Sequence, residues 1–263
     1  MDSSLGSLRV LIANIEKYRH FERFIPFCIE ADPEVVLLQE VPFNGLRHLA
    51  KAVGATKHFF VPMALDTFHG ARDEPIGLAI LLRLKDSQDG IACYSEFFYR
   101  RGIRNGSHLP IFTKDNNYTC DNCIQHVEIV KGGTVFAFGN THFPWTPDGA
   151  PDDVQYECMP KVVAYAKLLS LIVCGDFNAP RTLQSGTKGP IWDMLAREFR
   201  DNIPLYVDST LDPVLHRASK GGVSLPLVVD GLFTPKDYHA ENVVIHSGVS
   251  DHKPISAVMY RVS

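Results

Sequence analysis

The feature that most constrains the fold is a series of short apolar runs, rich in β-branched residues, that recurs along the chain. The runs read LRVLIAN, EVVLLQE, IGLAILL, TVFAFGNTH, SLIVCGDFN, LPLVVDGLF and PISAVMY. Runs of this length and composition, bounded by polar residues and turn signals, predict strands, most of them buried. The chain is therefore expected to build its core around β-sheet.

Longer segments with helical spacing lie between these runs. Gly54 is a natural C-terminal stop for one of them, and Pro160 predicts a kink or an early break in another. The predicted helices cover residues 21–32, 43–54 and 152–169.

A hairpin is predicted over residues 120–139, turning on Lys131, Gly132 and Gly133. Strands with hairpins and a few intervening helices indicate a mixed α/β or α+β arrangement. Since no linker, repeat or low-complexity tract interrupts the pattern, one domain over residues 1–263 is expected.

Composition excludes some classes of protein. A chain of 263 residues with 45% hydrophobic content can bury a large core, and a formal net charge of -4 argues against a basic surface over the whole molecule. A local basic patch stays open. The N-terminus lacks the pattern of a signal peptide, and no apolar run reaches membrane-spanning length. The six cysteines are scattered, which favours free thiols and a cytoplasmic location.

Polar side chains recur where the predicted strands end. Since residues i and i+2 of a strand point to the same face, Asn140 should project with His142, and Asp176 with Asn178. Any one such residue could simply mark where a buried strand reaches solvent, but that explanation weakens for the whole set. The set comprises Asn14, Gln39, Glu40, Asn140, His142, Asp176, Asn178, Asp230, Asp251 and His252.

These residue types suit one kind of chemistry. Carboxylate and amide oxygens from Glu40, Asp251, Asn14 and Asp176 suit Mg²⁺ or Mn²⁺. Histidines beside carboxylates can stabilise charge on a phosphoryl oxygen, and an aspartate can act as a general base on water. The chain has no Walker-type glycine loop, serine nucleophile elbow or common zinc motif. The set therefore indicates metal-assisted hydrolysis of a phosphate ester.

In order and approximate spacing, these motifs resemble the endonuclease/exonuclease/phosphatase superfamily over nearly the whole chain. The segments concerned are Asn14, LQE, NTH, GDFN, VVD and SDH. The resemblance implies an α/β fold, a four-layer α/β/β/α sandwich of two packed mixed sheets flanked by helices. It also implies in-line attack of water on phosphorus with a divalent metal, Mg²⁺ or Mn²⁺.

The resemblance assigns a metal role to part of the set. Glu40 matches the principal metal carboxylate, and Asn14 helps to hold the metal or its waters. Asp251 completes the metal site, and Asp176 is shared between the metal and the attacking water.

The remaining residues receive catalytic roles from the same resemblance. Asp176 orients or deprotonates the water, and Asn178 contacts the phosphate. His252 binds a non-bridging phosphate oxygen, and Asp230 orients His252. His142 matches a second histidine against the phosphate, as in many members.

The substrate cannot be identified from these motifs, because members of the family share the phosphate chemistry and differ in their loops. SDHKP is similar to the inositol polyphosphate 5-phosphatases, but Gly231 stands where those enzymes carry an arginine. LQEV and GDFN also fit abasic-site endonucleases and tyrosyl-DNA phosphodiesterases, without a recognisable motif for the mid-chain tyrosine of the abasic-site enzymes. NTHFPW, with Trp145, is similar to deadenylases and sphingomyelinase-like members.

Three further segments could contribute. Asn140, His216 and Arg217 are candidate substrate-binding residues. YRRGIRN, residues 99–105, could contact a phosphate backbone, although a solvated loop is the favoured interpretation. CDNCIQH, residues 120–126, could bind a metal or form a disulfide, but a lone Cys-x-x-Cys is weak support.

The preferred prediction is a phosphodiesterase acting on nucleic acid, with no transmembrane segment and no protein partner evident. The alternative is a phosphatase or phosphodiesterase of a lipid or small-molecule phosphate. A binding module without turnover is disfavoured because it would have no need of both Glu40 and Asp176.

Overall fold

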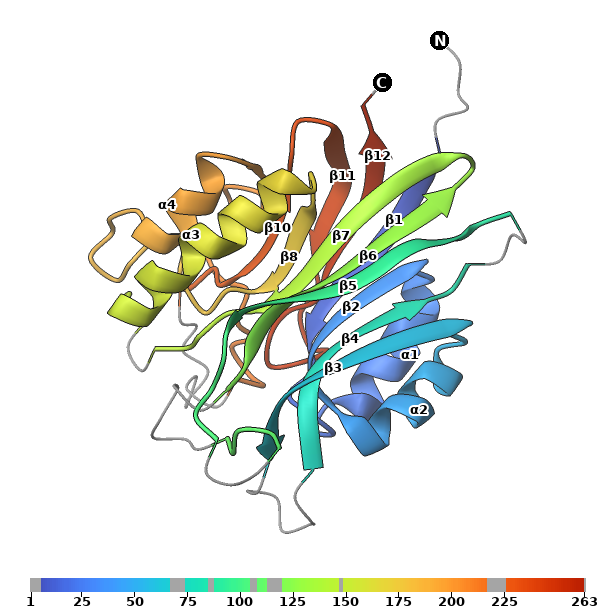
Figure 1. Cartoon of the computed structure of the whole chain (residues 1–263), viewed down its shortest axis with the longest axis horizontal. Helices are drawn as coiled ribbons and strands as arrows, with labels where there is room; N and C mark the ends of the chain where they lie inside the picture. The colour runs from blue at the N-terminus through green and yellow to red at the C-terminus, as the bar shows by residue number, and fades with distance from the viewer. Residues whose placement is uncertain are drawn as a thin grey trace.

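The framework of the molecule is a pair of mixed β-sheets (Figure 1). The computed structural model describes residues 6–66, 74–84, 88–104, 108–112, 120–146, 149–216 and 226–262. Within these residues each sheet has six strands. The first sheet has the order β11 (Tyr238–Ile245), β12 (Ile255–Arg261), β1 (Ser7–Asn14), β2 (Val35–Pro42), β4 (Glu74–Leu82), β3 (Lys57–Asp66). The second has the order β5 (Gly90–Arg100), β6 (Asn122–Lys131), β7 (Thr134–His142), β8 (Ile172–Asp176), β10 (Asp230–Thr234), β9 (Arg200–Asp201).

Helices cover the outer faces of both sheets, so the predicted four-layer sandwich is confirmed. Helices α1 (Phe21–Ala31) and α2 (Phe43–Ala52) pack on the first sheet, and α3 (Asp153–Leu168) and α4 (Pro190–Ala196) on the second (Figure 1). The pairs β1–β2 and β7–β8 are parallel, whereas the other strand pairs are antiparallel. Among the described residues, no helix is both long enough and apolar enough to span a membrane.

Alternation along β2 explains why the central runs are continuously apolar. Val35 and Leu37 pack into the core between the two sheets. Val36 and Leu38 point the other way and pack under α1 and α2. Because both faces of the strand are covered, no position on it favours a polar side chain until the strand end.

Most predicted elements are confirmed, and two differ in instructive ways. Helix α3 runs through Pro160 without a break. In the run predicted as a strand from Leu225, a residue outside the described part of the chain, the described residues form a strand only from Asp230 onward. Val228 and Val229 are buried, but their main-chain groups bond outside a sheet ladder, for example from Val229 N to Thr210 Oγ1. The sequence also gave no clear signal for β3, β5, β11 and α4.

The hairpin turn is confirmed at the predicted residues. Strand β6 ends at Lys131 opposite Thr134, which leaves Gly132 and Gly133 as the two-residue loop. Both glycines have positive φ, of 54° and 77°, as this type of hairpin turn requires.

Candidate active site

The predicted polar strand ends meet at one end of the sandwich, opposite the end where the two termini emerge (Figure 1). Strands β1 and β2 are parallel, so Asn14 and Glu40 end on the same side. In the second sheet His142 lies opposite Asp176 on the parallel pair β7–β8. Asp230 begins the antiparallel strand β10 directly opposite Asp176. The fold therefore gathers residues from both sheets into one site.

Asp176 lies at the centre of this site and is 1% exposed. Its Oδ2 accepts a hydrogen bond of 3.1 Å from Asn14 Nδ2, and its Oδ1 accepts one of 2.8 Å from the Asn178 main-chain N–H. The same Oδ2 lies 3.5 Å from His142 Nε2 and 3.7 Å from His252 Nδ1. One carboxylate thus contacts an amide and faces two imidazoles.

The backbone on both sides of Asp176 is adapted to this position. A Cβ at Gly175, where φ is 137°, would lie 1.9 Å from the Thr141 carbonyl oxygen, so only glycine lets β8 approach β7 this closely. At Asn178 φ is 48°, which turns the chain away from the sheet. The Asn178 side-chain amide donates to the Phe143 carbonyl at 2.9 Å. This bond fixes Asn178 beside the strand end that carries His142.

His252 and Asp230 form a buried ion pair. The distance from His252 Nδ1 to Asp230 Oδ2 is 2.9 Å, and to Oδ1 it is 3.1 Å. Burial alone would lower the pKa of His252, but Asp230 and Asp176 raise it well above its usual value. The imidazole is therefore held in its protonated form, with Nδ1–H bonded to Asp230.

Asp251 is affected by the charge of other carboxylates in the site. Burial raises its pKa to about 7; His252 opposes this shift, while Glu16 and Glu40 add to it. Glu40 sits at an irregularity in the β2–β4 ladder with φ of 55°, a strained conformation for this residue type. Three carboxylates crowded in this way are the oxygen ligands that a divalent cation prefers, so the donor set fits one.

Glu16 was not among the predicted residues. It follows Asn14 by two positions at the same strand end, and this spacing was the available signal. Asn14, predicted to help hold the metal or its waters, forms hydrogen bonds within the site. Its amide oxygen accepts from the Glu16 main-chain N–H at 3.1 Å, and its Nδ2 donates to Glu40 at 3.2 Å and to Asp176. Asn14 therefore ties the carboxylates together.

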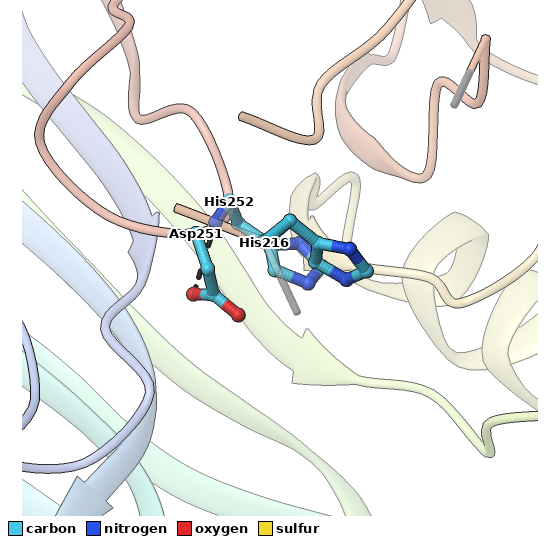
Figure 2. A group of neighbouring side chains, drawn as sticks. All are labelled: His216, Asp251 and His252. Atoms are coloured by element: carbon cyan, nitrogen blue, oxygen red, sulfur yellow. Dashed lines mark hydrogen bonds between the residues drawn. The ribbon is translucent and has the colours of Figure 1, made fainter. Parts of the chain in front are cut away.

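His216 comes to the site from a loop that precedes β10 (Figure 2). One ligand atom each of His216, Asp251 and His252 lies within 4.8 Å of the others. The two rings pack edge to face with centroids 5.9 Å apart. Burial and the charge of His252 lower the pKa of His216, and its buried Nδ1 has no hydrogen-bond partner among the residues that the structure describes. A neutral imidazole with an unpaired nitrogen is thus placed beside His252.

Asp212 fixes the loop that carries His216. Its Oδ1 accepts from the main-chain N–H groups of Val214 and Leu215, and its Oδ2 accepts from Gly248 N at 2.7 Å. Its own N–H donates to the Asp251 carbonyl at 2.7 Å. The loops that hold His216 and Asp251 are therefore bonded to each other. Arg217, the other residue predicted in this loop, lies outside the described residues.

Asn140 corrects one prediction. Asn140 lies on the same face of β7 as His142, two residues further from the strand end, and is fully buried. Its Oδ1 accepts from Gln39 Nε2 at 2.7 Å, and its Nδ2 donates to the Leu38 carbonyl at 3.0 Å. These partners belong to the other sheet. Asn140 thus joins the two sheets and does not reach a substrate, because the strand end covers it.

The arginine segment is anchored on a buried carboxylate. Asp121 Oδ2 accepts from Arg101 at 3.2 Å and from Arg104 at 2.5 Å, and Asp121 Oδ1 accepts from Gly102 N. Arg100 donates to Asn122 Oδ1 at 3.2 Å. Contacts with the buried side chains of Asp121 and Asn122 therefore hold the arginine segment in place.

The Cys-x-x-Cys segment does not form a metal site with His126. None of the six cysteines forms a disulfide. Cys123 packs with Met63 against the first sheet, whereas His126 faces Ser95 and Tyr165 on the opposite side of β6. An odd spacing along a strand places two side chains on opposite faces, so these two cannot share an ion.

Solved structures of known proteins match this fold. A protein from Bacteroides vulgatus, described as an endonuclease/exonuclease/phosphatase, gives a TM-score of 0.68 at 13% identity, over 98% of this chain and 100% of that one. The human Nocturnin catalytic domain gives 0.63 at 15% identity, over 97% and 95%. ANGEL2, described as a 2′,3′-cyclic phosphatase in complex with adenosine-2′,3′-vanadate, gives 0.65 at 13% identity, over 99% and 97%.

Sequence comparison agrees with the fold. No curated protein matches the chain in sequence. The profile of the Endonuclease/Exonuclease/phosphatase family, however, matches residues 7–252, a span that contains the polar strand ends of both sheets. The chain belongs to the Endonuclease/Exonuclease/phosphatase family, whose enzymes hydrolyse phosphate esters.

Proposed function

We propose that this protein is a divalent-cation-dependent phosphodiesterase that acts on nucleic acid. The observation that carries the proposal is the placement of Asp176, which one amide and two imidazoles face and which lies beside the His252–Asp230 pair. This arrangement places a base and hydrogen-bond donors around a single point, as hydrolysis of a phosphate ester requires.

Each residue has a role that follows from its contacts. Asp176 aligns a water molecule and accepts its proton as the water oxygen bonds to phosphorus and the bond to the leaving oxygen breaks. Protonated His252, fixed by Asp230, donates to a non-bridging phosphate oxygen, whose charge grows in the transition state. His142 and Asn178 contact the same phosphate from the other side, and His216 contacts the substrate beside His252.

A divalent cation fits the oxygen side of the site. Glu40 and Asp251 are its proposed ligands, with Glu16 near Asp251 and with Asn14 and Asp176 completing the cluster. The bound ion, Mg²⁺ or Mn²⁺, would neutralise charge on the phosphate. Without such an ion, burial and then the neighbouring carboxylates Glu16 and Glu40 raise the pKa of Asp251, and this supports the assignment.

Two features favour nucleic acid over an inositol phosphate. Trp145 follows His142 by three residues and is 46% exposed, so its indole can stack on a base. A Cβ at Gly231 would lie 2.8 to 3.0 Å from ring atoms of Phe233, Phe177 and Trp192. Position 231 therefore faces α4 and offers no side chain to a substrate. ANGEL2, a structural relative, is described with an adenosine derivative. The small-molecule alternative stays open to the test below.

The test compares wild-type protein with Asp176→Asn on a panel of nucleic acids, sphingomyelin and inositol phosphates, with Mg²⁺ or Mn²⁺ and with chelator. We expect chelator-sensitive cleavage of a nucleic acid and a loss of about 10²–10⁴-fold or more in the variant, with the fold intact by circular dichroism. Asp153→Asn, at the exposed start of α3, is the matched control and should keep full activity. Full activity in Asp176→Asn would overturn the proposal.

Trp145→Ala separates the two substrate classes. Loss of a stacking side chain should raise KM for the nucleic acid by about 5- to 100-fold, since one stacked base contributes about 1–3 kcal/mol. Hydrolysis of a small phosphodiester such as bis(p-nitrophenyl) phosphate should be unchanged. Equal effects on both substrates would argue against base stacking at Trp145.

The cytoplasmic location expected from the sequence stays a prediction. The six cysteines form no disulfide, which is consistent with a reducing compartment.

A further inference from the structure

Asp251 also belongs to a second group of side chains. This group consists of Glu16, His20 and Asp251, with one ligand atom from each within 4.8 Å of the others. His20 is 4% exposed, and none of the sequence motifs includes it. The group therefore adds a buried imidazole to the crowded carboxylates described above.

The spacing of the three ligand atoms matches a shared ion. His20 Nε2 lies 3.0 Å from Glu16 Oε2 and 3.9 Å from Asp251 Oδ1. Around an octahedral ion with bonds of about 2.1 Å, neighbouring ligand atoms are about 3.0 Å apart and opposite ones about 4.2 Å. The first distance fits neighbouring ligands, and the second lies between the two values.

The backbone holds this group in place without help from an ion. After β1 the chain turns through positive φ at Glu16 and Lys17, and the Lys17 N–H donates to the Glu40 carbonyl at 3.1 Å. The His20 carbonyl accepts from Arg23 N and Phe24 N, in the first turn of α1. The imidazole is thus fixed at a helix start beside the site, as a preorganised ligand must be.

We propose that His20 Nε2, Glu16 and Asp251 together bind a divalent transition-metal cation, so that the protein prefers an ion such as Mn²⁺ to Mg²⁺. A nitrogen ligand strengthens binding of first-row transition metals, whereas Mg²⁺ favours oxygen ligands and water. The inference rests on the cation dependence in the proposed function. The competing interpretation is that His20 only donates a hydrogen bond to Glu16 and never contacts the ion.

Pulsed electron paramagnetic resonance of the Mn²⁺-loaded protein distinguishes these interpretations. We expect the wild type to show the nitrogen coupling of a directly bound imidazole, and His20→Gln to lose it. Glutamine keeps a hydrogen-bond donor for Glu16 but has no ring nitrogen. His58→Gln, an exposed change on β3, should keep the coupling. Absence of the coupling in wild type, or its persistence in His20→Gln, would overturn the proposal without depending on how any variant folds.

Calorimetric titration gives a second readout. In His20→Gln the affinity for Mn²⁺ should fall by about tenfold or more, while the affinity for Mg²⁺ should change by less than about threefold. Equal losses for both ions would mean that His20 only positions Glu16. Neither measurement uses turnover. Metal-dependent hydrolysis without the nitrogen coupling would therefore contradict this proposal alone and leave the proposed function intact.

Discussion

Asp251 shows how single residues of the site depend on one another. It lies beside His252 in sequence and close to Glu16 and Glu40 in space. Its ionised form is opposed by burial and by two carboxylates, and His252 and a hydrogen bond from Ser250 offset them only in part. A carboxylate in this position destabilises the fold when it ionises, unless a cation is bound near it.

The stability of the metal-free protein should therefore fall as the pH rises. The carboxyl has a pKa of 3.8 when unfolded and about 7 when folded, so the folded state binds the extra proton between these values. The contribution of this residue to the free energy of unfolding is fully present below about pH 4 and is lost as the pH rises toward 7, with a slope of at most about 1.4 kcal/mol per pH unit. His252, whose pKa is also raised, adds a fall above pH 6.5.

Chemical denaturation across pH 5 to 8, with chelator and then with Mn²⁺ or Mg²⁺, measures this slope. A saturating cation should stabilise the protein and flatten the curve, because it favours the ionised carboxylate. Asp251→Asn should be flatter than wild type in chelator and respond less to the ion. A slope that neither the ion nor the variant changes would remove Asp251 from the cation site.

Where a motif indicated both the residue type and its position at a strand end, as at Asp176 and Asp230, the structure brings the predicted residues together. Glu16 and His20 were missed because a loop carries them there and no periodicity marks a loop. Asn140 was misplaced for a different reason. The alternation of side chains along a strand predicts which face a residue lies on. It does not predict at which residue burial ends, because burial depends on the packing of the other sheet.

At the scale of elements, α3 shows tertiary contacts overriding local preference. Pro160 predicts a kink or an early break. The helix does not break, and Cys158, Met159 and Val162 are buried in the core on both sides of the proline. Pro160 itself is exposed. The sequence identified the helix and its N-terminal Asp152, but it could not show that packing would outweigh the missing hydrogen bond.

Pro160→Ala should stabilise the protein. The change restores a main-chain donor in the helix interior and removes the ring's clash with the preceding turn, which outweighs the added entropy of the unfolded chain. We expect the free energy of unfolding to rise by about 1–2 kcal/mol in a denaturant titration. Pro235→Ala, in the turn before β11, should bring no such gain. A destabilised Pro160→Ala would show that the proline shapes α3 for packing.

At the scale of the whole molecule, polar bonds in the core help to join the two sheets. Asn140 on β7 binds Gln39 and the Leu38 carbonyl of β2, the Ala79 carbonyl of β4 and Gln125 of β6. The apolar runs predicted buried strands, and the resemblance implied two packed sheets. The hydrogen bonds between the sheets could not be predicted from the sequence, because they depend on which residues face each other across the core. That the chain is one domain over residues 1–263 stays a prediction.

Asn140→Ala tests the joining role against the substrate role first expected. The variant leaves buried polar groups on both sheets without partners, so the free energy of unfolding should fall by about 2–4 kcal/mol. Since Asn140 is fully buried, KM measured well below the unfolding temperature should stay within about twofold of wild type. Asn44→Ala, exposed at the start of α2, should change stability by less than about 0.5 kcal/mol. A rise in KM with unchanged stability would restore Asn140 to the substrate site.

The expected result would instead mean that the sheets are held together directly beneath His142, so the same contacts that stabilise the sandwich also fix the distance between its two catalytic halves.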